Sequence, residues 1–109
     1  MERYTSFQEF WPYYLSEHLD PRCRALHYAG TVTGLGIFIA SIATMAPLLI
    51  PLALVCGYGP AWIGHFFIEN NRPATFQYPR WSFLGDLKML ACFATGRLSA
   101  ELEALNRES

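Results

Sequence analysis

Three histidines offer the clearest chemistry in this sequence. His65 lies inside an aromatic stretch, GYGPAWIGHFFIENNRPATF (residues 57–76), and Glu69 follows it four residues later. Residues four apart lie on one face of a helix, so this pair can grip one metal ion from successive turns. The other two histidines, His18 and His27, lie far from it in the sequence. A metal site therefore requires a fold that brings all three together.

The composition is that of a membrane protein rather than a soluble domain. Of the 109 residues, 52% are hydrophobic and 16% are charged, whereas soluble domains have about 25% charged residues. Residues 28–68 form a run of 41 without a single Asp, Glu, Lys or Arg. A bilayer core needs about 20 apolar residues per helix, so this run predicts two spans. We expect an all-α integral membrane protein, a transmembrane helical hairpin flanked by amphipathic interfacial helices.

Pro47 and Pro51 mark the turn of this hairpin, and the predicted spans are residues 21–46 and 51–69. With the bend at Pro47, His27 lies twenty residues before it and His65 eighteen after it. At about 1.5 Å per residue, the two histidines reach depths within roughly 3 Å of each other. His18 precedes the Asp20-Pro21 turn, which can fold it back toward them. We therefore expect all three histidines near one membrane interface.

Helices are also predicted on both sides of the hairpin, within a single membrane domain spanning residues 1–109. Residues 6–19 have an aromatic stripe at helical spacing, and Ser6 and Glu9 have capping-box spacing. Residues 82–96 predict a short apolar helix, interfacial, re-entrant or a tilted third span, and residues 97–107 a polar tail helix. Asp20 is a good N-cap and Pro21 a good first residue for the first span. Gly30 and Gly34 have the spacing that lets two membrane helices approach closely, which makes a homodimer possible.

Charge indicates topology and excludes some partners. All eight Lys and Arg residues lie outside the uncharged run, so both termini are expected in the cytoplasm, with the protein in a bacterial inner membrane or the endoplasmic reticulum. The apolar run starts too late and is too long for a cleaved signal peptide. The net charge of −1 and the absence of a basic stripe argue against a nucleic-acid partner. Cys23, Cys56 and Cys92 have no metal-site or disulfide spacing and are interpreted as packing thiols.

The residues near the histidines leave several interpretations open. Histidine with carboxylate suits Fe(II), Zn or Mn, and Glu17 and Asp20 could act as ligands or accept a hydrogen bond from an imidazole. A single histidine at a membrane edge is, however, commonly a hydrogen-bonded helix terminator. Basic residues near the same interface can contact lipid headgroups and set topology, or hold the acidic head of a lipid substrate. These are Arg22, Arg24, Arg72 and Arg80.

Two long motifs resemble a known family. YYLSEHLDPRCRALHYAGT and GYGPAWIGHFFIENNRPATFQYPRWSFLGDLKM are similar to the small membrane proteins that include the 2-hydroxy fatty acid dioxygenase of fatty-acid α-oxidation. The resemblance extends from Phe10 to Met89. Asp20-Pro21 stands where the family usually has Asn-Pro, and aspartate, like asparagine, can cap the helix that follows. The resemblance implies an Fe(II)-dependent enzyme that uses O₂ to shorten a 2-hydroxy fatty acid by one carbon, within the breakdown of the sphingolipid base phytosphingosine.

The resemblance also implies roles for particular residues. It assigns His18, His27 and His65 as iron ligands, and Glu69 as a fourth ligand or a base beside them. Glu17, Asp20 and Asp86 are weaker candidates for such roles. A 2-hydroxy acid can chelate Fe(II) through its carboxylate and hydroxyl. Its acyl tail would lie among Trp62, Ile63, Phe66 and Phe67, or against Leu35 and Phe38.

Two other classes of function compete with the oxygenase. One is a membrane electron carrier that holds haem between two of the histidines. The other is a non-catalytic membrane module whose polar cluster only fastens helices together. Metal content and absorption spectra distinguish the three classes.

Overall fold

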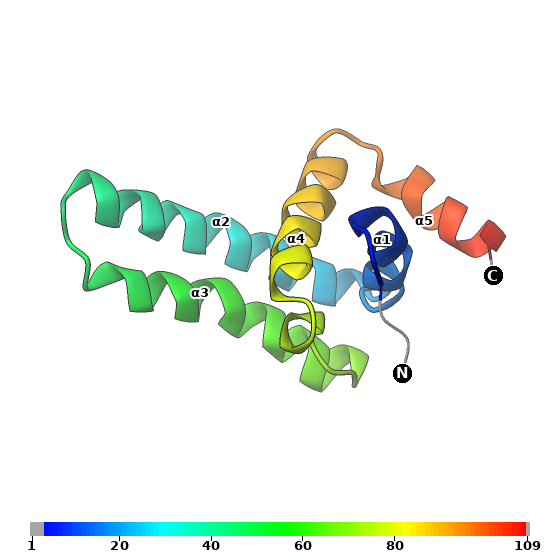
Figure 1. Cartoon of the computed structure of the whole chain (residues 1–109), viewed down its shortest axis with the longest axis horizontal. Helices are drawn as coiled ribbons and strands as arrows, with labels where there is room; N and C mark the ends of the chain where they lie inside the picture. Colours follow the sequence, from blue (N-terminus) through cyan, green and yellow to red (C-terminus); the bar gives the residue numbers. More distant parts are fainter. Residues whose placement is uncertain (1–3, 109) are drawn as a thin grey trace. The chain divides into compact units, whose positions relative to one another are not determined.

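The computed structural model describes residues 4–108, and every regular element there is helical (Figure 1). This confirms the all-α prediction. The contacts divide the chain into two compact units. The hairpin unit is Asp20–Pro73, and the flanking unit combines the residues up to Leu19 with those from Ala74 on.

The first helix of the hairpin unit, α2 (Pro21–Ala43), begins as predicted. The Asp20 side chain accepts a hydrogen bond from the backbone N–H of Arg22 at 2.8 Å, and Pro21 occupies the first turn. The predicted end at residue 46 is wrong, because Thr44 caps the helix and Met45 takes a left-handed backbone with φ of 53°. The chain therefore leaves the helix just before Pro47.

The second helix of the hairpin, α3 (Leu49–Ile63), begins two residues before the predicted start at Pro51. A proline in the first turn is tolerated because the N–H groups there have no partner within the helix. Beyond Ile63 the chain continues as the π-helix η1 (Gly64–Glu69) and ends at Asn70, whose φ is 59°. The turn of the hairpin lies at Pro47, as the sequence predicted, and α2 and α3 lie side by side (Figure 1).

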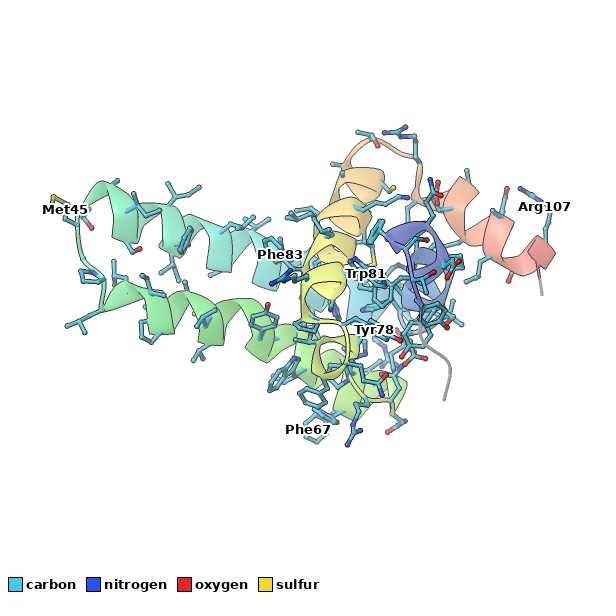
Figure 2. All side chains as sticks on the ribbon, in the orientation of Figure 1. Met45, Phe67, Tyr78, Trp81, Phe83 and Arg107 are labelled. Carbon is cyan, nitrogen blue, oxygen red and sulfur yellow. The ribbon has the colours of Figure 1, made fainter. Side chains whose placement is uncertain are left out.

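Helix α2 is long and apolar enough to cross a membrane, and so is the continuous helical segment formed by α3 and η1. Only 17% of the apolar window in Pro21–Ala43 and 22% of that in Leu49–Glu69 is buried within the protein. The core helix of a soluble domain would instead be mostly covered. Large apolar side chains are exposed along the hairpin, and Met45 and Leu48 at its turn are 87% and 88% exposed (Figure 2). An exposed apolar surface of this kind is typical of helices that face lipid.

Glycines set the distance between the two hairpin helices. A Cβ atom on Gly30 would lie 2.6 Å from the carbonyl oxygen of Gly57, and one on Gly34 would lie 2.9 Å from the Gly57 Cα. The expectation that Gly30 and Gly34 let two membrane helices approach closely is confirmed, and the homodimer stays a prediction. Their small size is used within one chain, where it lets α2 and α3 approach closely.

The flanking unit contains α1 (Phe7–Ser16), the 3₁₀ turn η2 (Ala74–Phe76), α4 (Pro79–Ala94) and α5 (Leu98–Glu108). Helix α1 ends before the predicted residue 19, so that His18 lies outside it. Helix α4 starts earlier than the predicted residue 82, because Pro79 occupies its first turn, where proline is favoured. The capping box of α1 is incomplete: Ser6 accepts from the Glu9 N–H, while the Glu9 carboxylate binds Thr5.

Aromatic contacts hold α1 against α4. Phe10 is fully buried, and its ring lies 5.2 Å from that of Tyr78 and 5.8 Å from that of Trp81, centroid to centroid. The Trp11 indole donates a hydrogen bond to Glu101 of α5 at 2.8 Å, and the Lys88 ammonium lies 4.4 Å from its ring centroid. The predicted aromatic stripe thus packs within the flanking unit.

Replacing Gly30 by Ala should destabilise the hairpin by about 1–3 kcal/mol, because the new methyl group meets backbone that cannot move aside. Gly36→Ala is the matched control, since no described atom lies within 4 Å of the position of its Cβ. The control should leave the thermal midpoint in detergent, followed by circular dichroism, unchanged or slightly raised. Equal midpoints for the two variants would contradict the close-approach argument.

Candidate metal centre

His27 and His65 lie opposite each other in the hairpin unit. His27 is on the second turn of α2 and His65 near the start of η1. Their ring centroids are 4.9 Å apart with the rings perpendicular, and the two residues are 3% and 2% exposed. The predicted match in depth is therefore confirmed for this pair.

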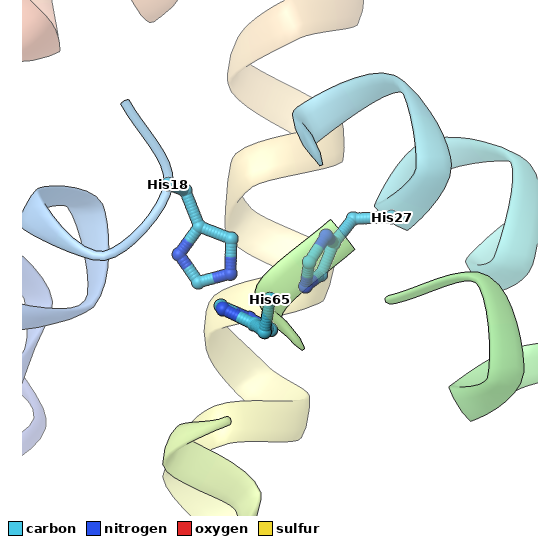
Figure 3. A group of neighbouring side chains, drawn as sticks. All are labelled: His18, His27 and His65. Atoms are coloured by element: carbon cyan, nitrogen blue, oxygen red, sulfur yellow. The ribbon is translucent and has the colours of Figure 1, made fainter. Parts of the chain in front are cut away.

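His18 completes the group of histidines. It follows α1 in a short non-helical segment and is 1% exposed. One ligand atom from each of His18, His27 and His65 can be chosen so that all three lie within 4.8 Å of one another (Figure 3). Nitrogens held at about 2 Å from one ion lie roughly 3–4 Å apart, so the three side chains would move slightly closer together on binding it. The central expectation from the sequence, that these three side chains meet, is confirmed.

Hydrogen bonds select the same nitrogen on each ring for a ligand. Nδ1 of His18 lies 2.6 Å from the carbonyl oxygen of Tyr14, and Nδ1 of His27 lies 2.8 Å from that of Cys23. Nδ1 of His65 lies 2.7 Å from the side-chain oxygen of Asn71. These oxygens only accept, so each Nδ1 carries the proton and donates. Nε2 then keeps its lone pair, which is the arrangement of a neutral metal-binding imidazole.

The local backbone of α2 explains the hydrogen bond made by His27. In α2, the Cys23 carbonyl lies one turn before His27 and is reached by its imidazole. The Cys23 thiol lies 3.8 Å from the same Nδ1, and a Cβ on Gly64 would lie 2.8 Å from the Cys23 sulfur. The buried thiol therefore fills the space between α2 and η1, which agrees with the packing role expected for it.

The end of the π-helix η1 brings a hydrogen-bond acceptor to the His65 ring. Asn70 ends this π-helix in a left-handed conformation, and the next residue, Asn71, donates its backbone N–H to the His65 carbonyl at 2.9 Å. This return brings the Asn71 side chain to the His65 ring. Asparagine tolerates left-handed backbone well, so the pair Asn70-Asn71 both ends the helix and supplies the acceptor. The expectation that His65 and Glu69 share one helix face assumed an α-helix, whereas these residues form a π-helix.

The carboxylates predicted beside the histidines form hydrogen bonds and helix caps elsewhere. The three-histidine group contains no carboxylate among the described residues. Glu69 Oε2 accepts the backbone N–H of Asp20 at 2.6 Å, which ties the end of η1 to the start of α2. Asp20 caps α2, and its hydrogen bond from Arg22 lowers the pKa of its carboxyl to about 2. Glu17 is half-buried and caps the end of α1.

The arginines predicted to hold a lipid head differ in their surroundings. The Arg22 guanidinium makes two bonds to Asp20, at 3.1 and 2.9 Å, and its side chain is 76% exposed. Arg24 is half-buried, while Arg72 and Arg80 are exposed. Their role in substrate binding stays a prediction.

Sequence reasoning missed two residues that support the histidines and gave a third too little weight. Asn71 and Tyr14 hold His65 and His18, and Asp86 accepts a hydrogen bond from the Tyr14 hydroxyl. Burial raises the pKa of the Asp86 carboxyl to about 7, although the bond from Tyr14 opposes this. The only available signal was position: Asn71 lies six residues after His65 within the second motif, and Tyr14 lies one turn before His18.

Comparison with known families agrees with this site. The family model described as 2-hydroxy-palmitic acid dioxygenase Mpo1-like matches residues 4–98. The chain belongs to the Mpo1-like family. The match spans all three histidines and confirms the resemblance drawn from the sequence motifs. No match was found among curated proteins or solved structures.

The bond between Glu69 and Asp20 gives a prediction about stability. Glu69→Ala removes the acceptor of the Asp20 N–H and should lower the free energy of unfolding by about 1–3 kcal/mol. Glu69→Gln keeps an oxygen at the same place and should lose less. Denaturant unfolding in detergent measures both, and amide exchange at Asp20 reports the bond itself. Equal loss in the two variants would show that this acceptor is not what holds the helix ends.

Proposed function

We propose that this protein is an Fe(II)-dependent dioxygenase that shortens 2-hydroxy fatty acids by one carbon. The observation that supports this most is the buried group of three histidines whose Nδ1 atoms are all occupied by oxygen acceptors. The description of the Mpo1-like family supports the reaction class.

The donor set fits a divalent iron. Imidazole nitrogen suits Fe, Zn and Cu, and three such ligands leave coordination positions for a substrate and for O₂. Bound Fe(II) would supply the activation of O₂ and the chelation of the substrate's carboxylate and hydroxyl. Because His18, His27 and His65 contribute no negative charge, the site favours a negatively charged substrate.

The proposed reaction balances without an external reductant. One 2-hydroxy acid and one O₂ give the acid shorter by one carbon, CO₂ and water. The bond between the carboxyl carbon and C2 breaks, and C2 is oxidised from an alcohol to a carboxylic acid. The substrate therefore supplies all the electrons that O₂ takes up.

In this scheme the chain's own residues would hold the metal and orient the groups around it. The three buried histidines hold the metal where bulk water has little access, which limits side reactions. Glu69 acts as a positioning residue through Asp20, which lies two residues after His18. A direct ligand or base role for Glu69 or Glu17 stays a prediction.

The substrate would lie with its head at the histidines and its tail in the membrane. Ile63, Phe66 and Phe67 lie close to His65 in the sequence and are 51%, 45% and 77% exposed, and they are the proposed apolar contacts for the tail. Arg22, Arg24 and Arg72 belong to the same end of the hairpin and are the proposed contacts for the carboxylate. We place both termini in the cytoplasm, in a bacterial inner membrane or the endoplasmic reticulum, and a homodimer remains compatible with this arrangement.

Iron retention tests the ligand set. His18→Ala, His27→Ala and His65→Ala should each lose the iron that wild-type protein, purified without oxygen, retains in stoichiometric amount. All three variants should keep their helical circular dichroism in detergent. Gln77→Ala, an exposed change in the loop before α4, is the control and should retain iron. If a histidine variant kept full iron and full turnover, that histidine would not be an iron ligand. A Soret band in the wild-type protein would favour haem.

The stoichiometry of the reaction tests the chemistry. Incubation of iron-loaded protein with 2-hydroxypalmitate and O₂ should consume O₂ and release CO₂ and pentadecanoate in equal amounts, with no reductant added. Mass spectrometry, an oxygen electrode and CO₂ trapping measure the three quantities. Turnover that depends on an added electron donor would contradict this scheme and favour a monooxygenase.

A further inference from the structure

His18 differs from the other two histidines because no helix orients it. His27 lies in α2 and His65 in η1, so the backbone fixes the direction of each side chain. His18 lies after the end of α1, where its own N–H bonds to the Leu15 carbonyl at 2.9 Å. The orientation of its ring therefore depends on the groups that contact the ring.

Tyr14 contacts His18 in two ways. Its carbonyl accepts the Nδ1 proton of His18 at 2.6 Å, which fixes the tautomer. Its ring stacks on the imidazole with the centroids 4.1 Å apart and the planes at 25°. Tyr14 is fully buried, so its ring has little freedom to turn. The plane of the His18 ring therefore depends on the position of the Tyr14 ring.

Helix α4 holds Tyr14 in place through two consecutive residues. The Tyr14 hydroxyl donates a hydrogen bond to the Asp86 carboxylate. A Cβ on Gly85 would lie 2.8–3.1 Å from atoms of the Tyr14 ring, so only glycine lets the α4 backbone lie against that ring. Gly85 thus provides the space for Tyr14 and Asp86 provides its acceptor.

We propose that Tyr14 and Asp86 are positioning residues for the metal ligand His18. The bond between hydroxyl and carboxylate fixes the Tyr14 ring, and the ring fixes the imidazole at the angle that metal binding requires. This inference rests on the proposed function, because it takes His18 as a ligand. Neither residue touches the metal or the substrate, and both act through His18.

A purely structural role would give a different result. If the bond only fastened α1 to α4, its loss would lower the unfolding midpoint and leave the metal affinity of the folded protein unchanged. Metal affinity and midpoint must therefore be measured on the same variants. Co(II) is the probe, since its visible absorption reports binding directly and needs no turnover.

Tyr14→Phe is the decisive variant. It keeps the stacked ring and the backbone carbonyl and removes only the hydroxyl donor. We expect its Co(II) affinity to fall by about tenfold, the lower end of the effect usual for residues that orient metal ligands. Tyr13→Phe is the matched control, because the neighbouring Tyr13 ring stacks on Tyr4 at 5.2 Å. Its Co(II) affinity should equal that of the wild type.

Asp86 variants test the other end of the same bond. Asp86→Asn keeps an oxygen that can accept from Tyr14 and should retain wild-type affinity. Asp86→Leu has no acceptor and should bind Co(II) as weakly as Tyr14→Phe. The double variant should be no weaker than either single variant, because both remove one interaction. If Asp86→Leu does not fold, the comparison of Tyr14→Phe with Tyr13→Phe still decides the question.

The outcomes separate this inference from the proposed function. Tyr14→Phe binding Co(II) as tightly as Tyr13→Phe would overturn the positioning role, whatever happens to the midpoint. If His27→Ala and His65→Ala also bind Co(II) like the wild type, the metal centre itself is wrong. If the histidine variants bind Co(II) weakly and Tyr14→Phe binds it fully, the metal centre stands and only the positioning role of Tyr14 and Asp86 is wrong.

Discussion

The backbones of α2 and α3 approach each other at glycines, and this approach determines how far apart His27 and His65 lie. Gly30 and Gly34 face Gly57 at distances that leave no space for a methyl group. His27 lies one turn before Gly30, at the open end of the hairpin. Had larger residues separated the helices, the two imidazoles would have moved apart by the same amount. In a bilayer, where apolar side chains gain nothing by leaving lipid for a protein interior, such close packing is a main source of helix association. The contact that stabilises the hairpin thus also positions two of the three histidines.

A second constraint operates on each imidazole. A histidine can bind a metal through either nitrogen, and the nitrogen that faces the ion must carry no proton. Here each Nδ1 donates to an oxygen, and each oxygen comes from a different kind of structure: a carbonyl at the end of α1, a carbonyl within α2 and the amide side chain that follows η1. Pre-setting the tautomers in this way means that metal binding requires no rearrangement of protons. Fastening of helices alone would not require a shared choice of nitrogen, which is why we favour a metal centre over a structural cluster.

The sequence predicted the parts of this arrangement that depend on local chemistry. The uncharged run indicated the hairpin, Pro47 its turn, and Asp20-Pro21 the start of α2. The meeting of the histidines followed from counting residues along two spans. The contacts that orient the rings could not be predicted, because they depend on details that counting does not capture. The π-turn of η1 and the left-handed Asn70 place Asn71 on His65, and the approach of α4 through Gly85 places Asp86 on Tyr14. The hydrogen bond between Glu69 and Asp20 could not be predicted either, since spacing shows which face a carboxylate lies on but not which donor it binds.

Charge links the membrane setting to the proposed substrate. Three neutral imidazoles leave the two positive charges of Fe(II) uncompensated, and an uncompensated charge is costly where the surroundings are apolar. A 2-hydroxy carboxylate that chelates through both oxygens offsets this charge, whereas an ordinary lipid chain does not. Metal and substrate should therefore stabilise each other's binding. A carboxylate ligand from the protein would reduce this advantage, because it would offset part of the charge before the substrate arrived. On the proposed function, the absence of a carboxylate from the three-histidine group among the described residues is what makes the site selective for an acid that chelates.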